Sequence, residues 1–216
     1  MAPIPVYFFS HGSTMMLGEE SSLAKYWKQY GDKALKNRIK GIVIMVCTLR
    51  NKPDVKSPVA YVHPSKYVDY KLNTDLETPE RCIKLLVDAG FNTSGNDTFE
   101  WIHDVYLILI RMFPKKCPPT TLISLNARYD PHYHMKVGST VRELRNEGYL
   151  IIGTGGAVHN LYRNRQAVYV ITTTSGPQFR RAITRFMKYP KYRDAHATND
   201  YFMSAMFVAG VAGEPL

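Results

Sequence analysis

Two continuous apolar runs place the strongest constraint on what this chain can fold into. The segments 40–48 (KGIVIMVCT) and 149–153 (YLIIG) show no regular alternation of polar and apolar residues. Such runs are typical of strands that are covered on both faces, as in parallel sheets flanked by helices. The apolar segments 4–9 (IPVYFF) and 120–126 (TTLISLN) predict two further strands.

Helical patterns lie between and after these strands. Thr78 and Pro79 predict an N-cap and the first residue of a helix that Gly90 ends. Strands that alternate with helices predict an α/β fold. We expect one domain over residues 1–216, a sandwich whose central mixed, mostly parallel sheet is covered by helices on both faces. The other expected helices cover 20–37, 103–112, 135–147, 176–188 and 199–212, and residues 167–172 are ambiguous.

Composition excludes several classes of protein. The three cysteines at 47, 82 and 117 lack CxxC spacing, so we expect neither a disulfide framework nor a zinc knot, and a cytoplasmic location. No apolar run reaches the roughly 18 residues that span a bilayer, and the N-terminus does not resemble a signal peptide. The net charge is +10, but the basic residues are scattered. This scattered charge favours solubility and attraction of anions over nucleic-acid binding. We expect the partner to be a small molecule, and the protein to be a monomer or homodimer.

Three strands are followed by polar turns, two of them glycine-flanked: SHGS at 10–13, VCTL at 46–49 and GTGGAVHNL at 153–161. The carboxyl ends of strands in an open α/β sheet converge on the ligand crevice. We therefore expect His11 and His159 to face one pocket. The third turn is not GxGxxG, and the chain has no P-loop, GxSxG or HExxH motif.

The remaining histidines leave alternatives open. His103 stands at the start of an expected helix, where a structural role is common. His132 and His134 in YDPHYH form either a metal pair or part of a polar loop before a helix. His63 lies in the long polar segment 50–75, which either helps to close the site as a lid or is a solvated surface loop.

The order of several longer motifs resembles that of the class III extradiol dioxygenases of the LigB type, in their 4,5-DOPA extradiol dioxygenase-like branch. The likeness covers nearly the whole chain and is most specific over 119–161 and 194–214. The motifs are SHGS, TPERCIKLLVDAGF, WIHDVYLILIRMFP, the segment from PTTLISLN to AVHNL, and DAHATNDYFMSAMFVAGVAGE.

The resemblance implies a particular site. Members of the family hold a non-haem Fe(II), or zinc, on three protein ligands and open a catechol ring with O₂. The first ligand is matched by His11, but Thr48 and Tyr201 stand where the family has its other two histidines. The acid–base histidines are matched by His103 and His159, although Asp104 replaces the glycine that follows the first of them.

These replacements predict that no metal cofactor is bound. A threonine hydroxyl is a weak ligand, and a tyrosine phenolate favours Fe(III) over Fe(II), so His11 alone would not retain the ion. An alternative set of His11, His63 and Asp200 would rebuild a two-histidine, one-carboxylate site for Fe(II) or zinc.

We therefore predict a metal-independent lyase, isomerase or cyclase that performs acid–base chemistry on an aromatic or polyketide-like phenol, including anionic forms. His159 is the expected base, His103 the acid and Tyr201 the oxyanion stabiliser, with His11 beside them. The alternatives are an active ring-cleavage dioxygenase with a remodelled metal site and a non-enzymatic binding protein. The expected substrate contacts are Thr48, His63, Asp200 and His134.

Overall fold

The computed structural model describes residues 3–11, 14–17, 20–46, 56, 58–59, 61–74, 77–96, 101–156, 176–196 and 198–213. Its described strands form one four-stranded sheet in the order β1-β4-β2-β3, and every pairing is parallel. The α/β class and the four strands are thus confirmed. That residues 1–216 form a single domain stays a prediction. The strands are β1 (Val6–Ser10), β2 (Gly41–Val46), β3 (Thr120–Ser124) and β4 (Tyr149–Gly155).

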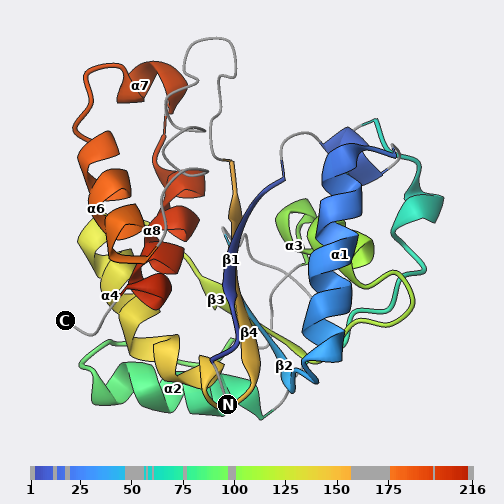
Figure 1. Ribbon diagram of the computed structural model, residues 1–216, viewed down its shortest axis with the longest axis horizontal. Coiled ribbons are helices and arrows are strands. Elements are labelled where there is room, and N and C mark those ends of the chain that lie inside the picture. The colour runs from blue at the N-terminus through green and yellow to red at the C-terminus, as the bar shows by residue number, and fades with distance from the viewer. Residues whose placement is uncertain are drawn as a thin grey trace.

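Helices cover both faces of the sheet (Figure 1). On one face lie α1 (Ser22–Lys36) and α3 (His103–Met112), packed on Ile42, Ile44 and Ile152 of the central strands. The intervening residues Val43, Met45 and Ile151 point into the core on the other face. Because both sets are apolar, the central strands carry the uninterrupted runs seen in the sequence.

The second face is covered by a larger group of helices, which share one core cluster (Figure 1). Among them α8 is buried almost all round, from Phe202 to Val211. It packs closely on α4, where a Cβ at Gly138 or Gly210 would collide with the backbone of the facing helix. The helices are α2 (Thr78–Asp88), α4 (Pro131–Val141), α6 (Gly176–Phe186), α7 (Tyr192–Ala195) and α8 (Asp200–Ala212), with 3₁₀ turns η1 (Thr14–Leu17), η2 (Pro64–Lys66) and η3 (Arg142–Arg145).

Two predicted helix boundaries are wrong. The helix expected over 135–147 begins at Pro131, because the side chain of Asp130 caps it by accepting a hydrogen bond from Tyr133 N–H. Pro131 then occupies the first helical position, which needs no N–H donor. In α2, Thr78 is the first helical residue rather than the N-cap, and it is buried. No helix in the described ranges is long and apolar enough to cross a membrane.

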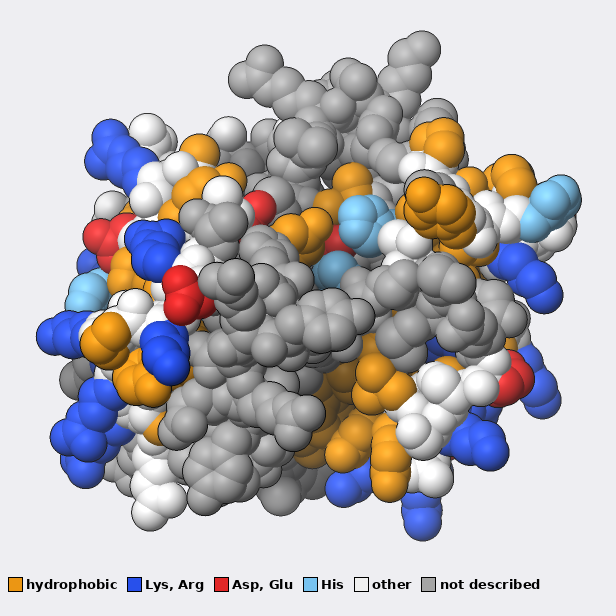
Figure 2. Space-filling model, turned by 90° about the horizontal axis from the view of Figure 1, so that it is seen from above, with side chains coloured by type: hydrophobic (Ala, Val, Ile, Leu, Met, Phe, Trp, Pro, Cys, Tyr) orange, Lys and Arg blue, Asp and Glu red, His pale blue; other side chains and the backbone are white. Residues whose placement is uncertain are grey.

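Because the described strands are all parallel, their carboxyl ends lie at one edge of the sheet, the upper edge in Figure 1. The helices α3 and α8 begin at this same edge. Figure 2 looks onto it and shows histidine and acidic side chains side by side near the middle of the face. This edge is where a ligand site is expected in a sheet of this kind.

Candidate functional site

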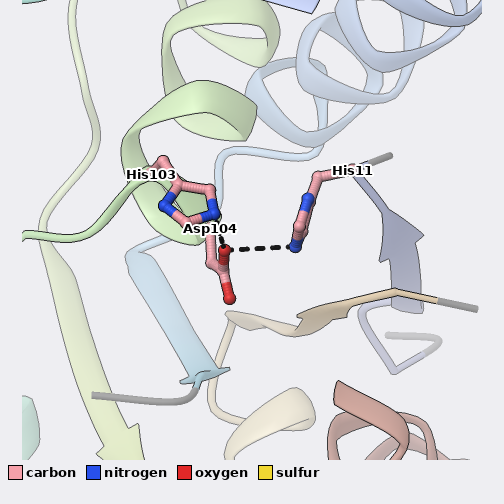
Figure 3. A group of neighbouring side chains, drawn as sticks. All are labelled: His11, His103 and Asp104. Carbon is pink, nitrogen blue, oxygen red and sulfur yellow. Dashed lines mark ion pairs between the residues drawn. The ribbon is translucent and has the colours of Figure 1, made fainter. Parts of the chain in front are cut away.

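The site is built from the end of β1 and the first turn of α3. His11 directly follows β1, and His103 and Asp104 are the first two residues of α3. The carboxylate oxygen Oδ1 of Asp104 lies 3.1 Å from Nε2 of His11 and 2.8 Å from Nε2 of His103. Figure 3 shows Asp104 between the two imidazole rings, which stand nearly perpendicular at 86°.

Two consecutive residues of β4 hold the halves of this cluster together. The backbone N–H of His11 donates to the carbonyl of Gly155, at 3.2 Å. The hydroxyl of Thr154 donates to the backbone carbonyl of Asp104, at 2.8 Å. The central strand therefore positions both the end of β1 and the start of α3, which are distant in sequence.

Tyr201 adjoins the cluster from the opposite face of the sheet. Its ring lies edge-on to that of His11, with centroids 5.6 Å apart. This approach requires Gly155, because a Cβ there would collide with the backbone carbonyl of Tyr201. The structure thus brings three of the predicted catalytic residues together: His11, His103 and Tyr201.

The carboxylate of Asp104 is almost completely buried, with 1% of the residue exposed. Burial alone would raise the pKa of Asp104, but contacts with His103 and His11 outweigh it and lower that pKa to about 2. Its position in the first turn of α3 also favours a negative charge, because the helix dipole is positive there. The cluster therefore contains an ionised carboxylate at neutral pH.

The contacts of Asp104 Oδ1 are close but poorly aligned. This oxygen is fully buried, yet no described residue donates a hydrogen bond of good geometry to it. The three donor atoms, two imidazole nitrogens and one carboxylate oxygen, lie within 4.8 Å of one another. Two imidazoles and a carboxylate are the ligand types of non-haem Fe(II) and zinc sites, so these residues fit such an ion.

Asp104 is the member of the site that sequence reasoning missed. The motif comparison treated it only as a departure from the family's glycine. The available signal was an acidic residue in the first turn of an apolar helix, directly after a candidate catalytic histidine. That signal does not reveal the approach of β1, on which the cluster depends.

The predicted ligand set of His11, His63 and Asp200 does not come together. His63 is exposed, and its Nδ1 accepts from Ser65 N–H at the start of η2. Asp200 is half-buried at the start of α8, where Oδ1 accepts from the hydroxyl of Thr198, at 2.6 Å. In this arrangement both side chains support local turns, and their predicted contacts with substrate stay predictions.

His134 has a structural role in this arrangement. Its Nε2 accepts from Asn126 N–H at 3.1 Å, and Nδ1 lies 2.6 Å from the carbonyl of Asp130. Both nitrogens of this buried ring therefore bind backbone groups, which does not support the predicted substrate contact. The alternative of a metal pair with His132 is likewise unsupported, since His132 is exposed on α4.

The described part of segment 50–75 is anchored on α3 by a few aromatic side chains, although most of its residues are exposed. Tyr67 is buried and stacks on Tyr106 with ring centroids 5.3 Å apart. The hydroxyl of Tyr70 donates to the carbonyls of Leu109 and Phe113 at the end of α3. These contacts tie residues 61–74 to the helix that carries His103.

Thr48 and His159 lie outside the described residues, as does most of the turn GTGGAVHNL and the ambiguous segment 167–172. Their predicted roles therefore stay predictions.

A cavity of about 200 Å³ lies away from this cluster, between α2 and the edge strand β3. Its lining includes no histidine or carboxylate, so it offers no competing catalytic cluster.

The fold and the cluster define an α/β protein with a histidine–carboxylate site at the carboxyl edge of a parallel sheet. No protein-family model matches the chain. Curated proteins named 4,5-DOPA dioxygenase extradiol are similar to it. The protein from Beta vulgaris is 26% identical over 165 residues, which are 71% of this chain and 62% of that relative. The protein from Portulaca grandiflora is 28% identical over 166 residues, which are 71% and 61% of the two chains.

A third relative with this name, from Escherichia coli K12, is 22% identical over 168 residues, 73% of this chain and 61% of its own. The matched region thus spans about three fifths of the length of these relatives. The crystal structure of an uncharacterized protein, JW3007 from Escherichia coli K12, has a TM-score of 0.66 and 18% identity over 96% of this chain and 88% of its own. These similarities confirm the α/β scaffold, and curated relatives carry the predicted dioxygenase name.

Proposed function

We propose that the chain is an enzyme on the scaffold of its dioxygenase-named relatives and that it performs acid–base chemistry on a phenolic or polyketide-like small molecule. The observation that carries this proposal is the His11–Asp104–His103 cluster at the carboxyl edge of the sheet. An ionised carboxylate buried between two imidazoles is an arrangement that stabilises a protonated histidine.

His103 is the group that exchanges protons with the substrate. About 30% of its side chain is exposed, whereas only 5% of the His11 side chain is. The Nε2 edge of His103 faces Asp104, and no described residue bonds to Nδ1 (Figure 3). Nδ1 therefore accepts a proton from the substrate, and the carboxylate stabilises the imidazolium that results.

Tyr201 and His11 complete the reaction centre. The Tyr201 ring borders His11, and its phenol group is a donor that can stabilise an oxyanion formed when a phenol or an adjacent carbonyl loses a proton. Isomerisation, dehydration, cyclisation and retro-aldol cleavage all pass through such an enolate or phenolate. His159, the base predicted from the sequence, would serve the same reaction from the turn at 153–161.

The proposal is tested with a panel of phenols, catechols and aromatic polyketides in the presence of a strong chelator, with products followed by NMR. His103→Gln should lower turnover by about 10²-fold or more, as is typical for loss of an acid–base group. His132→Gln, at an exposed position on α4, is the matched control and should retain full activity. Equal turnover by the two variants would remove His103 from the mechanism.

A second candidate is a ring-cleaving dioxygenase, and the donor set of the cluster favours it. His11, His103 and Asp104 would hold an Fe(II) ion. When bound, this ion supplies the site for O₂ and for the two catechol oxygens. His103 would then be a ligand and not a base. Catechol-dependent O₂ uptake that requires added Fe(II) and disappears in chelator would favour this candidate over proton transfer.

A further inference from the structure

We propose that His11 Nε2, His103 Nε2 and Asp104 Oδ1 bind one divalent first-row transition-metal ion. This ligand set differs from the positions matched to the family, which are His11, Thr48 and Tyr201. It also differs from the alternative set of His11, His63 and Asp200. The proposal goes beyond acid–base catalysis, because proton transfer by these side chains requires no ion.

The two distances from Asp104 Oδ1 match those between neighbouring ligands around an ion, and all three donor atoms lie within 4.8 Å of one another. Ligands at right angles on bonds of about 2.1 Å lie about 3 Å apart. The two contacts of Asp104 Oδ1 measure 3.1 Å and 2.8 Å. Hydrogen bonds would produce similar distances, but Oδ1 receives no well-aligned N–H from any described residue. Three donor atoms this close together, one of them a buried carboxylate oxygen without a well-aligned donor, are what an ion-binding site requires.

The surroundings of the three side chains suit an ion site. Asp104 and His11 are 1% and 4% exposed, so neither has to be desolvated when an ion binds. Their backbones are fixed by Thr154 and Gly155 of β4, which keeps the donors in place before binding. His103 is partly exposed, so this ligand is accessible from solvent.

Ion binding and proton transfer exclude each other at this site. A metal on Nε2 of His103 uses that lone pair, and the proton of the neutral ring then resides on Nδ1. His103 can no longer accept a proton from the substrate. Occupancy by an ion therefore determines which chemistry the three side chains can perform.

The test uses Co²⁺ and Zn²⁺ with the purified chain after treatment with chelator, in the absence of substrate. Titration calorimetry should show one site, the visible absorption of bound Co²⁺ should indicate mixed nitrogen and oxygen ligands, and the thermal unfolding midpoint should rise with Zn²⁺ concentration. Loss of residues that merely support metal ligands costs about 10–100-fold in affinity. Asp104→Asn and His103→Gln should therefore each weaken binding by at least about 100-fold.

The controls are His63→Gln and Asp200→Asn, which remove the members of the alternative ligand set and should bind Co²⁺ as the unmodified chain does. Circular dichroism identifies any variant that fails to fold, and His103→Gln changes the more exposed ligand if Asp104→Asn does not fold. Absence of binding, or binding that is lost in the controls and kept in the cluster variants, would overturn the proposal. Since no substrate is present, this result is independent of whether the proposed reaction occurs.

Discussion

The hydroxyl of Thr154, near the end of β4, donates a hydrogen bond to the backbone carbonyl of Asp104 at the start of α3. Both residues are 1% exposed. This bond joins the centre of the sheet to the helix turn that carries His103 and Asp104, and it does so next to the strand that leads to His11. The position of Asp104 relative to His11 therefore depends on a residue that belongs to neither segment.

Thr154→Val should lower the free energy of unfolding by about 1 kcal/mol, because it removes one buried hydrogen bond with little change of shape. Urea denaturation measures this effect. Thr121→Val is the matched control: the Thr121 hydroxyl is buried and bonds to no described residue, so its removal should be neutral or stabilising. Equal losses in the two variants would show that the bond from Thr154 contributes nothing specific.

Gly155→Ala should destabilise the fold by about 1–3 kcal/mol, because the added Cβ collides with the backbone carbonyl of Tyr201. It should also lower turnover, since α8 must move away from His11. Gly95→Ala places a Cβ at ordinary contact distance, 3.6 Å from Ile83, and serves as the control. Thermal unfolding and activity are measured on both, and an unchanged Gly155→Ala protein would contradict the close approach.

Tyr201→Phe should lower turnover by about 10²-fold, because it removes the hydroxyl that is proposed to stabilise the developing oxyanion. Steady-state kinetics should place the loss in kcat more than in KM. Tyr26→Phe, on the exposed face of α1, is the control and should behave as the unmodified protein. Full activity in the Tyr201 variant would assign that ring a packing role only.

Stability should fall on acidification because of His134. Burial lowers the pKa of His134, although the nearby Asp130 opposes this, and the folded state holds the ring neutral with Nε2 as an acceptor. A lowered pKa means that the unfolded chain binds the proton more tightly. This contribution is present above about pH 6.5, the unperturbed value, and is lost as the pH falls below it.

Unfolding midpoints of the unmodified chain, His134→Gln and the exposed control His132→Gln test this prediction between pH 7.5 and 5. His134→Gln should be less stable at pH 7.5 but should lose less stability on acidification than the other two. Parallel pH profiles for all three proteins would exclude His134 as the source.

Much of the fold could be predicted because apolar runs report strands directly. The uninterrupted segment at β2 is apolar on both faces, as Ile44 and Met45 on opposite sides demonstrate. The early start of α4 was missed because Asp130 and Pro131 were interpreted as loop residues, although an aspartate before a proline is also the signature of a helix start.

The candidate site was predicted less completely. The position of His11 at the end of a predicted strand, together with the family resemblance, selected His11, His103 and Tyr201. The structure brings these three residues together. The role of Asp104 could not be predicted, since it depends on the approach of β1 to α3 in space. The structural role of His134 was equally hidden, because its partners are backbone groups that carry no sequence signal.

The burial of α8 has a consequence for biosynthesis. This helix packs on β1, β4, α4 and α6, and it places Tyr201 beside the site. A nascent chain that has reached the end of β4 still lacks the helix that covers one face of its sheet. The apolar side chains of β1 and β4 that α8 covers therefore lack this cover until residue 212 has left the ribosome.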